Sequence, residues 1–190
     1  MAGSSKGKIL PVDRFVKSIE EQSLKLADSV FGQTVSGKWV YESEVIDYVE
    51  EDVIMIPDLS TIRKIPWNKE PTAQIICDLK YGTGEPSEIA PRQVLINIIE
   101  QLQEENLRAI VAPELEFYLC EQNLDPDLPL KTPIGKSGRR ETGSRVFGID
   151  AVNEFDKLTD DIYDYCELMN IGVDTLVPVS YTHLTLPTKA

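Results

Sequence analysis

Residues 111–119 read VAPELEFYL, an apolar stretch that carries two glutamates, Glu114 and Glu116, one residue apart. Its length and apolar character indicate a β-strand. Because strand side chains alternate between faces, both glutamates are expected on one face, with Leu115 and Phe117 on the other. One face of this strand is therefore expected to pack on the core, and the other carries charge.

The two carboxylates allow three interpretations. Like charges roughly 7 Å apart along a strand repel each other, but solvent screens the repulsion if the face is open. If the face lines a cleft, carboxylate oxygens favour Mg²⁺ or Mn²⁺, and this separation suits two neighbouring metal sites for phosphoryl transfer. A glycosidase acid–base pair is disfavoured, because such a pair flanks a bond from opposite sides and these two glutamates stand side by side.

Composition narrows the class of protein. The chain has 190 residues, of which 42% are hydrophobic, and this is enough for a globular protein with one core or two small ones. A net charge of −13 argues against a nucleic-acid or membrane partner, since both are bound through concentrated positive charge. Neither a signal peptide nor a transmembrane helix is predicted, so a cytoplasmic protein is expected. Three widely spaced cysteines indicate no disulfide framework and no zinc site.

The first half of the chain is expected to be a small unit of one helix and several strands. Apolar residues at helical spacing predict a short amphipathic helix over residues 11–22. Short apolar runs bounded by Gly, Pro, Asp and Ser predict strands over residues 29–37, 52–60 and 72–81. A Gly/Pro/Glu-rich stretch at residues 82–93 is interpreted as the boundary with a second unit.

The second half is expected to alternate helix and strand, which indicates an α/β or α+β layer. Pro91 opens a predicted helix whose buried face comprises Val94, Leu95, Ile98, Ile99 and Leu102. A polar loop is expected over residues 121–148, followed by a helix capped by Asn153 and continuing to Met169. A further strand is predicted over residues 171–177.

Eight motifs in order resemble the glutamine synthetase family, and most of all its γ-glutamylpolyamine (γ-glutamylputrescine) synthetase branch. The resemblance runs from about Gly7 to Leu176, so that it covers nearly the whole chain. Each motif alone is weak, but their common order is specific. The motifs are GKILPVDRF, SVFGQTVSG, IPDLSTIRKIPW, CDLKYGTGEP, APRQVL, APELEFYL, GRRETGSRVFGIDAVNEFDKL and YDYCELMNIGVDTL.

The resemblance implies an α+β fold, with a β-grasp-like N-terminal domain over residues 7–90 and the start of a catalytic domain over residues 91–178. It also implies that Glu114 and Glu116 each give one ligand to one of two Mg²⁺ or Mn²⁺ ions. ATP would phosphorylate the γ-carboxylate of glutamate, and an amine would then displace phosphate. Family members are ring-shaped homo-oligomers, with active sites shared between neighbouring subunits.

Two features bear on the substrate and on other sites. Ammonia-using members carry an acidic Asp-Gly-Ser-Ser stretch, and this chain has Phe31-Gly32-Gln33-Thr34 there, with Gly32 nearest the aspartate's position. A larger amine such as putrescine is therefore expected, with an ammonia-using glutamine synthetase as the alternative. Asp58 matches a family motif but suits a turn equally well. The arginines of GRRETGSRVF, namely Arg139, Arg140 and Arg145, are assigned no site.

The end of the chain departs from the family. Residues 179–190 lie in VPVSYTHLTLPTKA, whose VSYTHL resembles a translated sequencing adapter, so a non-native tail is expected, with a genuine edge strand as the alternative. His183, the single histidine, then has no functional role. The chain is predicted to be an N-terminal fragment without ligase activity alone. A second hypothesis is a non-catalytic binding or regulatory module that pairs with full-length subunits.

Overall fold

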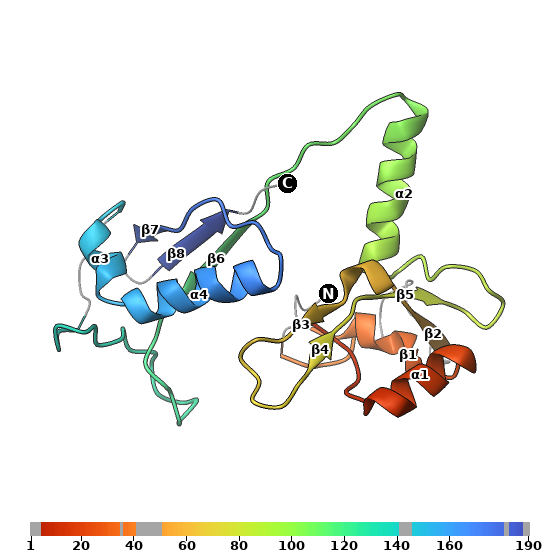
Figure 1. Cartoon of the computed structure of the whole chain (residues 1–190), viewed down its shortest axis with the longest axis horizontal. Helices are drawn as coiled ribbons and strands as arrows, with labels where there is room; N and C mark the ends of the chain where they lie inside the picture. Colours follow the sequence, from red (N-terminus) through yellow and green to blue (C-terminus); the bar gives the residue numbers. More distant parts are fainter. Residues whose placement is uncertain (1–4, 35, 41–50, 141–145, 181–182, 188–190) are drawn as a thin grey trace. The chain divides into compact units, whose positions relative to one another are not determined.

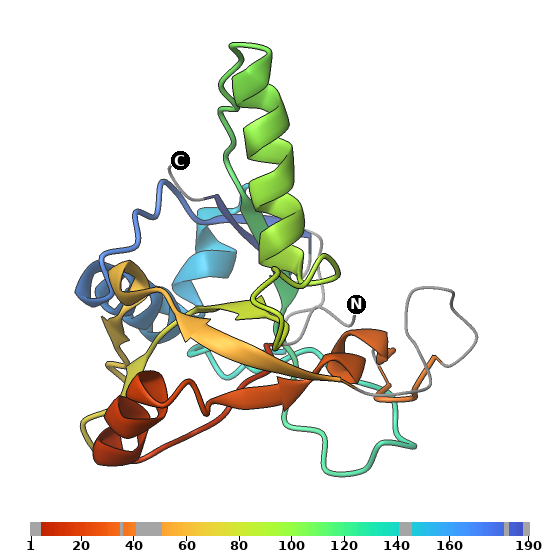
Figure 2. The same cartoon turned by 90° about the vertical axis from the view of Figure 1, so that its right-hand side faces the viewer.

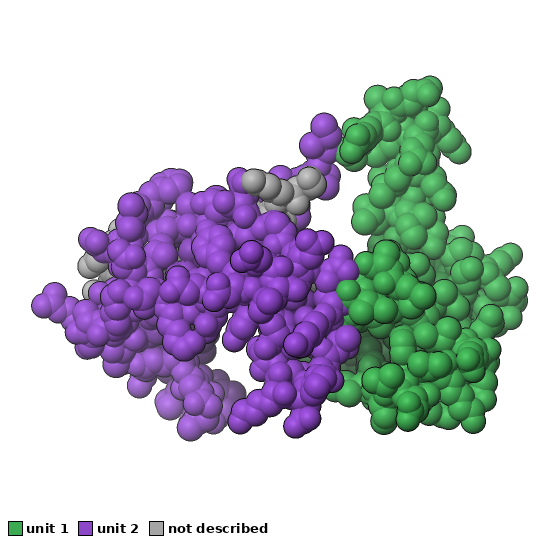
Figure 3. All heavy atoms as spheres, viewed as in Figure 1, with its two compact units in different colours: residues 1–62, 74–109 green, residues 63–73, 110–190 purple. Residues whose placement is uncertain are grey.

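The computed structural model describes residues 5–34, 36–40, 51–140, 146–180 and 183–187. These form two compact units (Figure 3). Unit 1 comprises residues 1–62 and 74–109, and unit 2 comprises residues 63–73 and 110–190. Helices and sheets occur in both, so the predicted mixed α+β class is confirmed. Arg145 and the tail residues 181–182 and 188–190 lie outside the described residues.

Unit 1 is built on a three-stranded antiparallel sheet of strand order β1-β2-β5 (Figure 1). Its core is small: Val53 of β2 is fully buried, and Leu79 and Ala90 pack with it. Phe31 and Met55 cover this cluster. The elements, in chain order, are α1 (Val12–Glu20), β1 (Lys25–Ala27), the 3₁₀ helix η1 (Asp28–Gly32), β2 (Asp52–Pro57), the 3₁₀ helix η2 (Leu59–Thr61), β5 (Cys77–Lys80) and α2 (Pro91–Glu104).

The predicted helix over residues 11–22 and the strand over residues 52–60 are confirmed by α1 and β2. The strand predicted over residues 29–37 is wrong, because the chain there forms η1, which places Phe31 on the core. The strand predicted over residues 72–81 is interrupted. Ile76 donates its backbone N–H to the hydroxyl of Thr61 at 2.9 Å, and its carbonyl accepts from Asp58 at 2.9 Å. These bonds tie Ile76 to the η2 turn, so it does not join a strand.

Helix α2 begins at Pro91 as predicted, but the expected burial of its apolar face is wrong. Val94 is 45% exposed, Leu95 57%, Ile98 48% and Ile99 41%. Figure 2 shows the reason: the helix axis is directed away from the strands of unit 1, so only its first turn lies beside them. The amphipathic pattern therefore predicted the helix, but these four apolar side chains are exposed in the described part of the chain, while Leu102 is half-buried.

Unit 2 contains a three-stranded antiparallel sheet of order β6-β8-β7 and two helices (Figure 1). The apolar side of α4 is more buried than that of α2: Ile162 is half-buried, and Met169, just after the end of the helix, is buried. Trp67 also packs against Tyr165 of α4, with ring centroids 5.8 Å apart. The elements are β3 (Arg63–Lys64), β6 (Glu114–Tyr118), α3 (Ile149–Asn153), α4 (Asp156–Leu168), β7 (Val177–Ser180) and β8 (His183–Pro187). The two-residue strand β4 (Ala73–Gln74), which pairs with β3, is divided between the units, with Ala73 in unit 2 and Gln74 in unit 1.

Two local predictions in unit 2 are wrong. Asn153 does not cap the long helix. It ends α3, and α4 begins at Asp156 without a side-chain cap. The strand predicted over residues 171–177 starts only at Val177, because Ile171 is used to end α4: its N–H donates to the carbonyl of Cys166 at 2.8 Å. Over the residues that the structure describes, no helix is both long and apolar enough to cross a membrane.

Candidate metal centre

The strand with the two glutamates forms as β6, and the predicted strand at VAPELEFYL is confirmed. It runs antiparallel to β8, with Glu114 opposite Pro187 and Glu116 opposite Thr185. The pleat of a strand places residues two apart on one face, about 7 Å from each other along the chain. Regular pairing through all five residues of β6 therefore keeps both carboxylates on the same face.

The environment of this pair is open. Glu114 and Glu116 are both exposed, and on the opposite face Phe117 is half-buried. Leu115 is 63% exposed, so the predicted division into a core face and a charged face is only partly realised. Exposed carboxylates of this kind are accessible to a hydrated cation.

The donor set fits part of a magnesium or manganese site. Carboxylate oxygens are the ligands that hard divalent cations prefer, and Mg²⁺ commonly takes one or two of them and keeps several waters. Within the described ranges, no group of three or more His, Cys, Asp or Glu side chains comes together around a possible metal position. Two carboxylates on one strand are therefore compatible with such ions, but further ligands would have to come from elsewhere.

The segment of residues 31–34, where the acidic stretch of ammonia-using members was expected to align, is uncharged and locally hydrogen-bonded. Phe31 packs on the core, and the Gly32 carbonyl accepts the N–H of Val40 at 2.8 Å. The side-chain oxygen of Gln33 accepts from Lys6 at 2.8 Å, and the Thr34 hydroxyl accepts the N–H of Lys38 at 3.1 Å. No carboxylate is thus supplied by residues 31–34.

Asp58 is held in the turn that the sequence suggested. Its carboxylate accepts the Ser60 N–H at 3.1 Å and the Ser60 hydroxyl at 2.6 Å, which caps η2. It also pairs with the guanidinium of Arg92, whose Nε lies 2.9 Å from Asp78. The hydrogen bond from Ser60 and then that from Arg92 hold the pKa of Asp58 below its ordinary value of 3.8. The Arg92 contacts were missed from sequence, because residues 34 positions apart share no periodic pattern.

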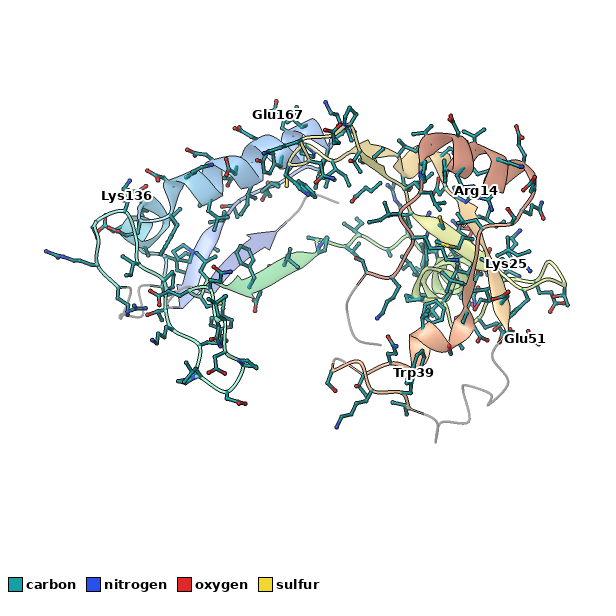
Figure 4. All side chains as sticks on the ribbon, turned by 90° about the horizontal axis from the view of Figure 1, so that it is seen from below. Arg14, Lys25, Trp39, Glu51, Lys136 and Glu167 are labelled. Atoms are coloured by element: carbon teal, nitrogen blue, oxygen red, sulfur yellow. The ribbon has the colours of Figure 1, made fainter. Side chains whose placement is uncertain are left out.

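The predicted loop over residues 121–148 contains no helix or strand in its described part, apart from an isolated bridge between Ile134 and Arg140. Arg140 pairs with Glu121 at 2.7 Å and donates to the Thr132 carbonyl, so it has a structural role. Arg139 is exposed. Figure 4 labels Lys136, whose ammonium lies 2.7 Å from Asp156 at the start of α4. The hydrogen bond from Lys136 lowers the pKa of Asp156.

Among the described residues, the cysteines join no group of three or more possible metal ligands. The backbone of His183 pairs with that of Tyr118 at the end of β6. Cys77 and Cys166 are half-buried, and burial raises the pKa of both thiols. Cys120 is exposed.

Comparison with known proteins shows that the sequence of this chain is similar to members of one family. Residues 88–180 match the model of the glutamine synthetase catalytic domain. The chain is 29% identical over 177 residues to the γ-glutamylputrescine synthetase PuuA of Escherichia coli (strain K12), covering 92% of this chain and 37% of that protein. It is 31% identical over 124 residues to a glutamate–isopropylamine ligase of a Pseudomonas species, covering 64% of this chain and 27% of that protein.

Solved structures show the same fold. A crystal structure of a glutamine synthase homologue matches 99% of this chain and 41% of its own length, with a TM-score of 0.76 and 16% sequence identity. This chain thus spans well under half of the length of these relatives. The resemblance to the glutamine synthetase family is confirmed by these matches, and residues 88–180 are the part that is similar to its catalytic domain.

Proposed function

We propose that this chain is the N-terminal part of an ATP-dependent ligase that joins the γ-carboxyl group of glutamate to an amine, and that Glu114 and Glu116 each bind one divalent cation. The observation that supports this most is the placement of two exposed carboxylates on one face of β6, inside the segment that matches the catalytic-domain model. The relatives named as synthetases and ligases support the reaction class.

The reaction has two steps. A γ-carboxylate oxygen of glutamate attacks the γ-phosphorus of ATP, ADP leaves, and a γ-glutamyl phosphate forms. The amine nitrogen then attacks the acyl carbon, phosphate leaves, and loss of a proton gives the amide. Mg²⁺ or Mn²⁺, when bound, offsets negative charge on the phosphate oxygens. Glu114 and Glu116 would hold these ions in place, so their contribution would be electrostatic positioning.

The amine in this proposal is a polyamine such as putrescine. Residues 31–34 offer no carboxylate to bind and deprotonate ammonium, because Phe31, Gly32, Gln33 and Thr34 are all uncharged. The full-length enzyme should therefore use putrescine far more efficiently than ammonium. Comparing kcat/KM for the two amines tests this, and equal efficiency would support the ammonia-using alternative.

The proposal also covers the organisation of the protein. Residues 7–90 would form the β-grasp-like N-terminal domain, residues 91–178 the start of the catalytic domain, and residues 179–190 a non-native tail. The complete protein would be a cytoplasmic ring-shaped homo-oligomer, in which neighbouring subunits complete each active site. Reading the genomic DNA across codon 177 tests the tail: an open frame into further metal-binding residues is expected.

Metal titration tests the two glutamates directly. The 190-residue chain should bind Mn²⁺ weakly, and Glu114→Gln or Glu116→Gln should each lower that affinity about tenfold by removing one charged ligand. Glu100→Gln, at an exposed position of α2, is the matched control and should change nothing. Electron paramagnetic resonance of free Mn²⁺ measures all four proteins. Equal affinity in the wild type and both strand variants would rule out this site.

The purified chain is expected to show no ATP-dependent γ-glutamyl amide formation, because a site with two carboxylates lacks the remaining ligands. Measurable product with glutamate, ATP, Mg²⁺ and putrescine would overturn the fragment proposal. The Glu114→Gln variant, assayed in the same way, would show whether such activity depends on β6.

A binding or regulatory module is the second candidate, and the exposed apolar face of α2 favours it. An apolar face of this kind usually lies against a partner. A true stop codon after Ala190 in the genome, together with co-purification of full-length family subunits, would support the module. A continuous reading frame would support the ligase fragment.

A further inference from the structure

Unit 1 contains a cavity, and all of its lining residues belong to unit 1. Its volume is about 410 Å³, within the usual range of small-molecule sites. Three segments line it: the N-terminal residues Lys6, Gly7 and Lys8; the strand β1 with Val30 of η1; and Asp52 at the start of β2. Figure 4 labels Lys25, the β1 residue at this site.

The lining is positively charged although the chain is strongly acidic. Three lysines, Lys6, Lys8 and Lys25, face one carboxylate, Asp52, which leaves a formal charge of +2 against −13 for the whole chain. Non-specific attraction of anions is therefore weak elsewhere on this protein. A local cluster of cations in a concave site concentrates anions there.

None of the three ammonium groups is fully neutralised. Lys6 donates to the uncharged side-chain oxygen of Gln33 at 2.8 Å. Lys25 lies 4.0 Å from Asp52, at the outer limit of an ion pair. Lys8 has no hydrogen-bond or ion-pair partner among the residues that the structure describes. Each can therefore donate to a ligand without breaking a strong ion pair.

The uncharged residues that line the cavity indicate the size and polarity of its ligand. Leu26, Ala27 and Val30 are half-buried and give the site an apolar wall. Asp28 is not among the lining residues, and its carboxylate accepts the backbone N–H of Glu51 at 3.3 Å. A ligand with two anionic groups and a small carbon frame matches this combination.

We propose that the cavity between residues 6–8, β1 and the start of β2 binds a small anion that carries at least two negative charges on phosphate or carboxylate groups. Lys8 and Lys25 donate to the anionic oxygens, while Lys6 is oriented by Gln33. Charge-assisted hydrogen bonds of this kind are shorter and roughly twice as strong as those between neutral groups. The site is independent of Glu114 and Glu116.

Calorimetric titration of the 190-residue chain at constant ionic strength tests this, with inorganic phosphate in one arm and malonate in the other. Saturable binding of one anion per chain is expected in at least one arm. Lys8→Gln should weaken it about tenfold, which corresponds to one lost charge-assisted hydrogen bond. Lys69→Gln, at an exposed lysine outside the cavity, is the matched control and should leave the affinity unchanged.

Two further variants keep the test independent of folding defects. Lys8→Arg should retain binding, and Asp52→Asn should tighten it, because it removes the one competing carboxylate. Binding of phosphate alone indicates a phosphorylated ligand, and binding of malonate alone indicates a polycarboxylate. Absence of saturable binding in both arms, or an equal loss in Lys69→Gln, would overturn the proposal.

Discussion

At the scale of single residues, Gly135 occupies a position where no side chain larger than hydrogen fits. It lies in a tight turn that is closed by its N–H donating to Arg139 at 3.0 Å. A Cβ added there would lie 2.2 Å from Oε2 and 2.7 Å from Cβ of Glu154. Glu154 cannot simply move away, because its carboxylate accepts the Ser137 N–H at 3.0 Å. We predict that Gly135→Ala lowers the free energy of unfolding of unit 2 by about 1–3 kcal/mol, as measured by urea titration.

The control for this prediction is Gly82→Ala. No atom lies within 4 Å of a Cβ built at Gly82. The same added methyl group should therefore change the free energy of unfolding by less than about 0.5 kcal/mol. Similar losses in both variants would show that contact with Glu154 is not the cause.

Asp58 predicts a pH dependence of stability. Because Ser60 and Arg92 hold its folded-state pKa below the ordinary 3.8, this carboxylate stabilises the fold above about that value. The contribution is lost as the pH falls through the lowered folded pKa. Asp58→Asn should therefore reduce stability at pH 6, and the difference from the wild type should shrink below pH 3.8. Urea titrations at both pH values measure it, and a difference independent of pH would contradict the argument.

At the scale of elements, three helices end in the same way. The residues after α1, α2 and α4 take a left-handed conformation at Gln22 (φ 49°), Asn106 (φ 56°) and Asn170 (φ 54°). In each, the N–H of the following residue donates to a carbonyl five positions back, as in a Schellman motif. The Asn170 motif is the reason that the segment after α4 is not yet a strand. No glycine marks these ends, so the sequence signals for helix termini were weak.

Gln22 is the most costly of these positions, since asparagine tolerates the left-handed region better than glutamine does. Gln22→Gly should raise the free energy of unfolding by about 0.5–1 kcal/mol, because relief of backbone strain exceeds the added entropy of glycine. Thermal unfolding monitored by circular dichroism measures it.

Gln101→Gly is the matched control within α2. There the backbone is helical, and the same substitution should cost about 1 kcal/mol. The free energy of unfolding is therefore expected to rise in Gln22→Gly and to fall in Gln101→Gly. Loss of stability in both would mean that φ at Gln22 carries no appreciable strain.

At the scale of the whole molecule, the two compact units predict separable responses to mutation. Val53 is fully buried in unit 1, and Val53→Ala should lower the stability of that unit by about 2 kcal/mol. Amide hydrogen exchange should show faster opening in β1, β2 and β5, with the amides of α4 unchanged.

Val12→Ala, at a position that is 74% exposed on α1, provides the control and should shift stability by less than about 0.5 kcal/mol. Faster exchange across both units in Val53→Ala would mean that the chain unfolds as one cooperative body. The prediction for independent units would then be wrong.

Local patterns in the sequence determined several elements of this protein. Strand alternation put Glu114 and Glu116 on one face, helical spacing predicted α1, α2 and α4, and ordered motifs carried the resemblance to a family. These succeed because they depend on neighbours in the chain. Only the tertiary structure shows that Arg92 pairs with Asp58 and Asp78. The same is true of the cavity lined by Lys6, Lys8 and Lys25 and of the exposure of the apolar face of α2. Each of these depends on where distant segments meet, and a short-range pattern contains no such information.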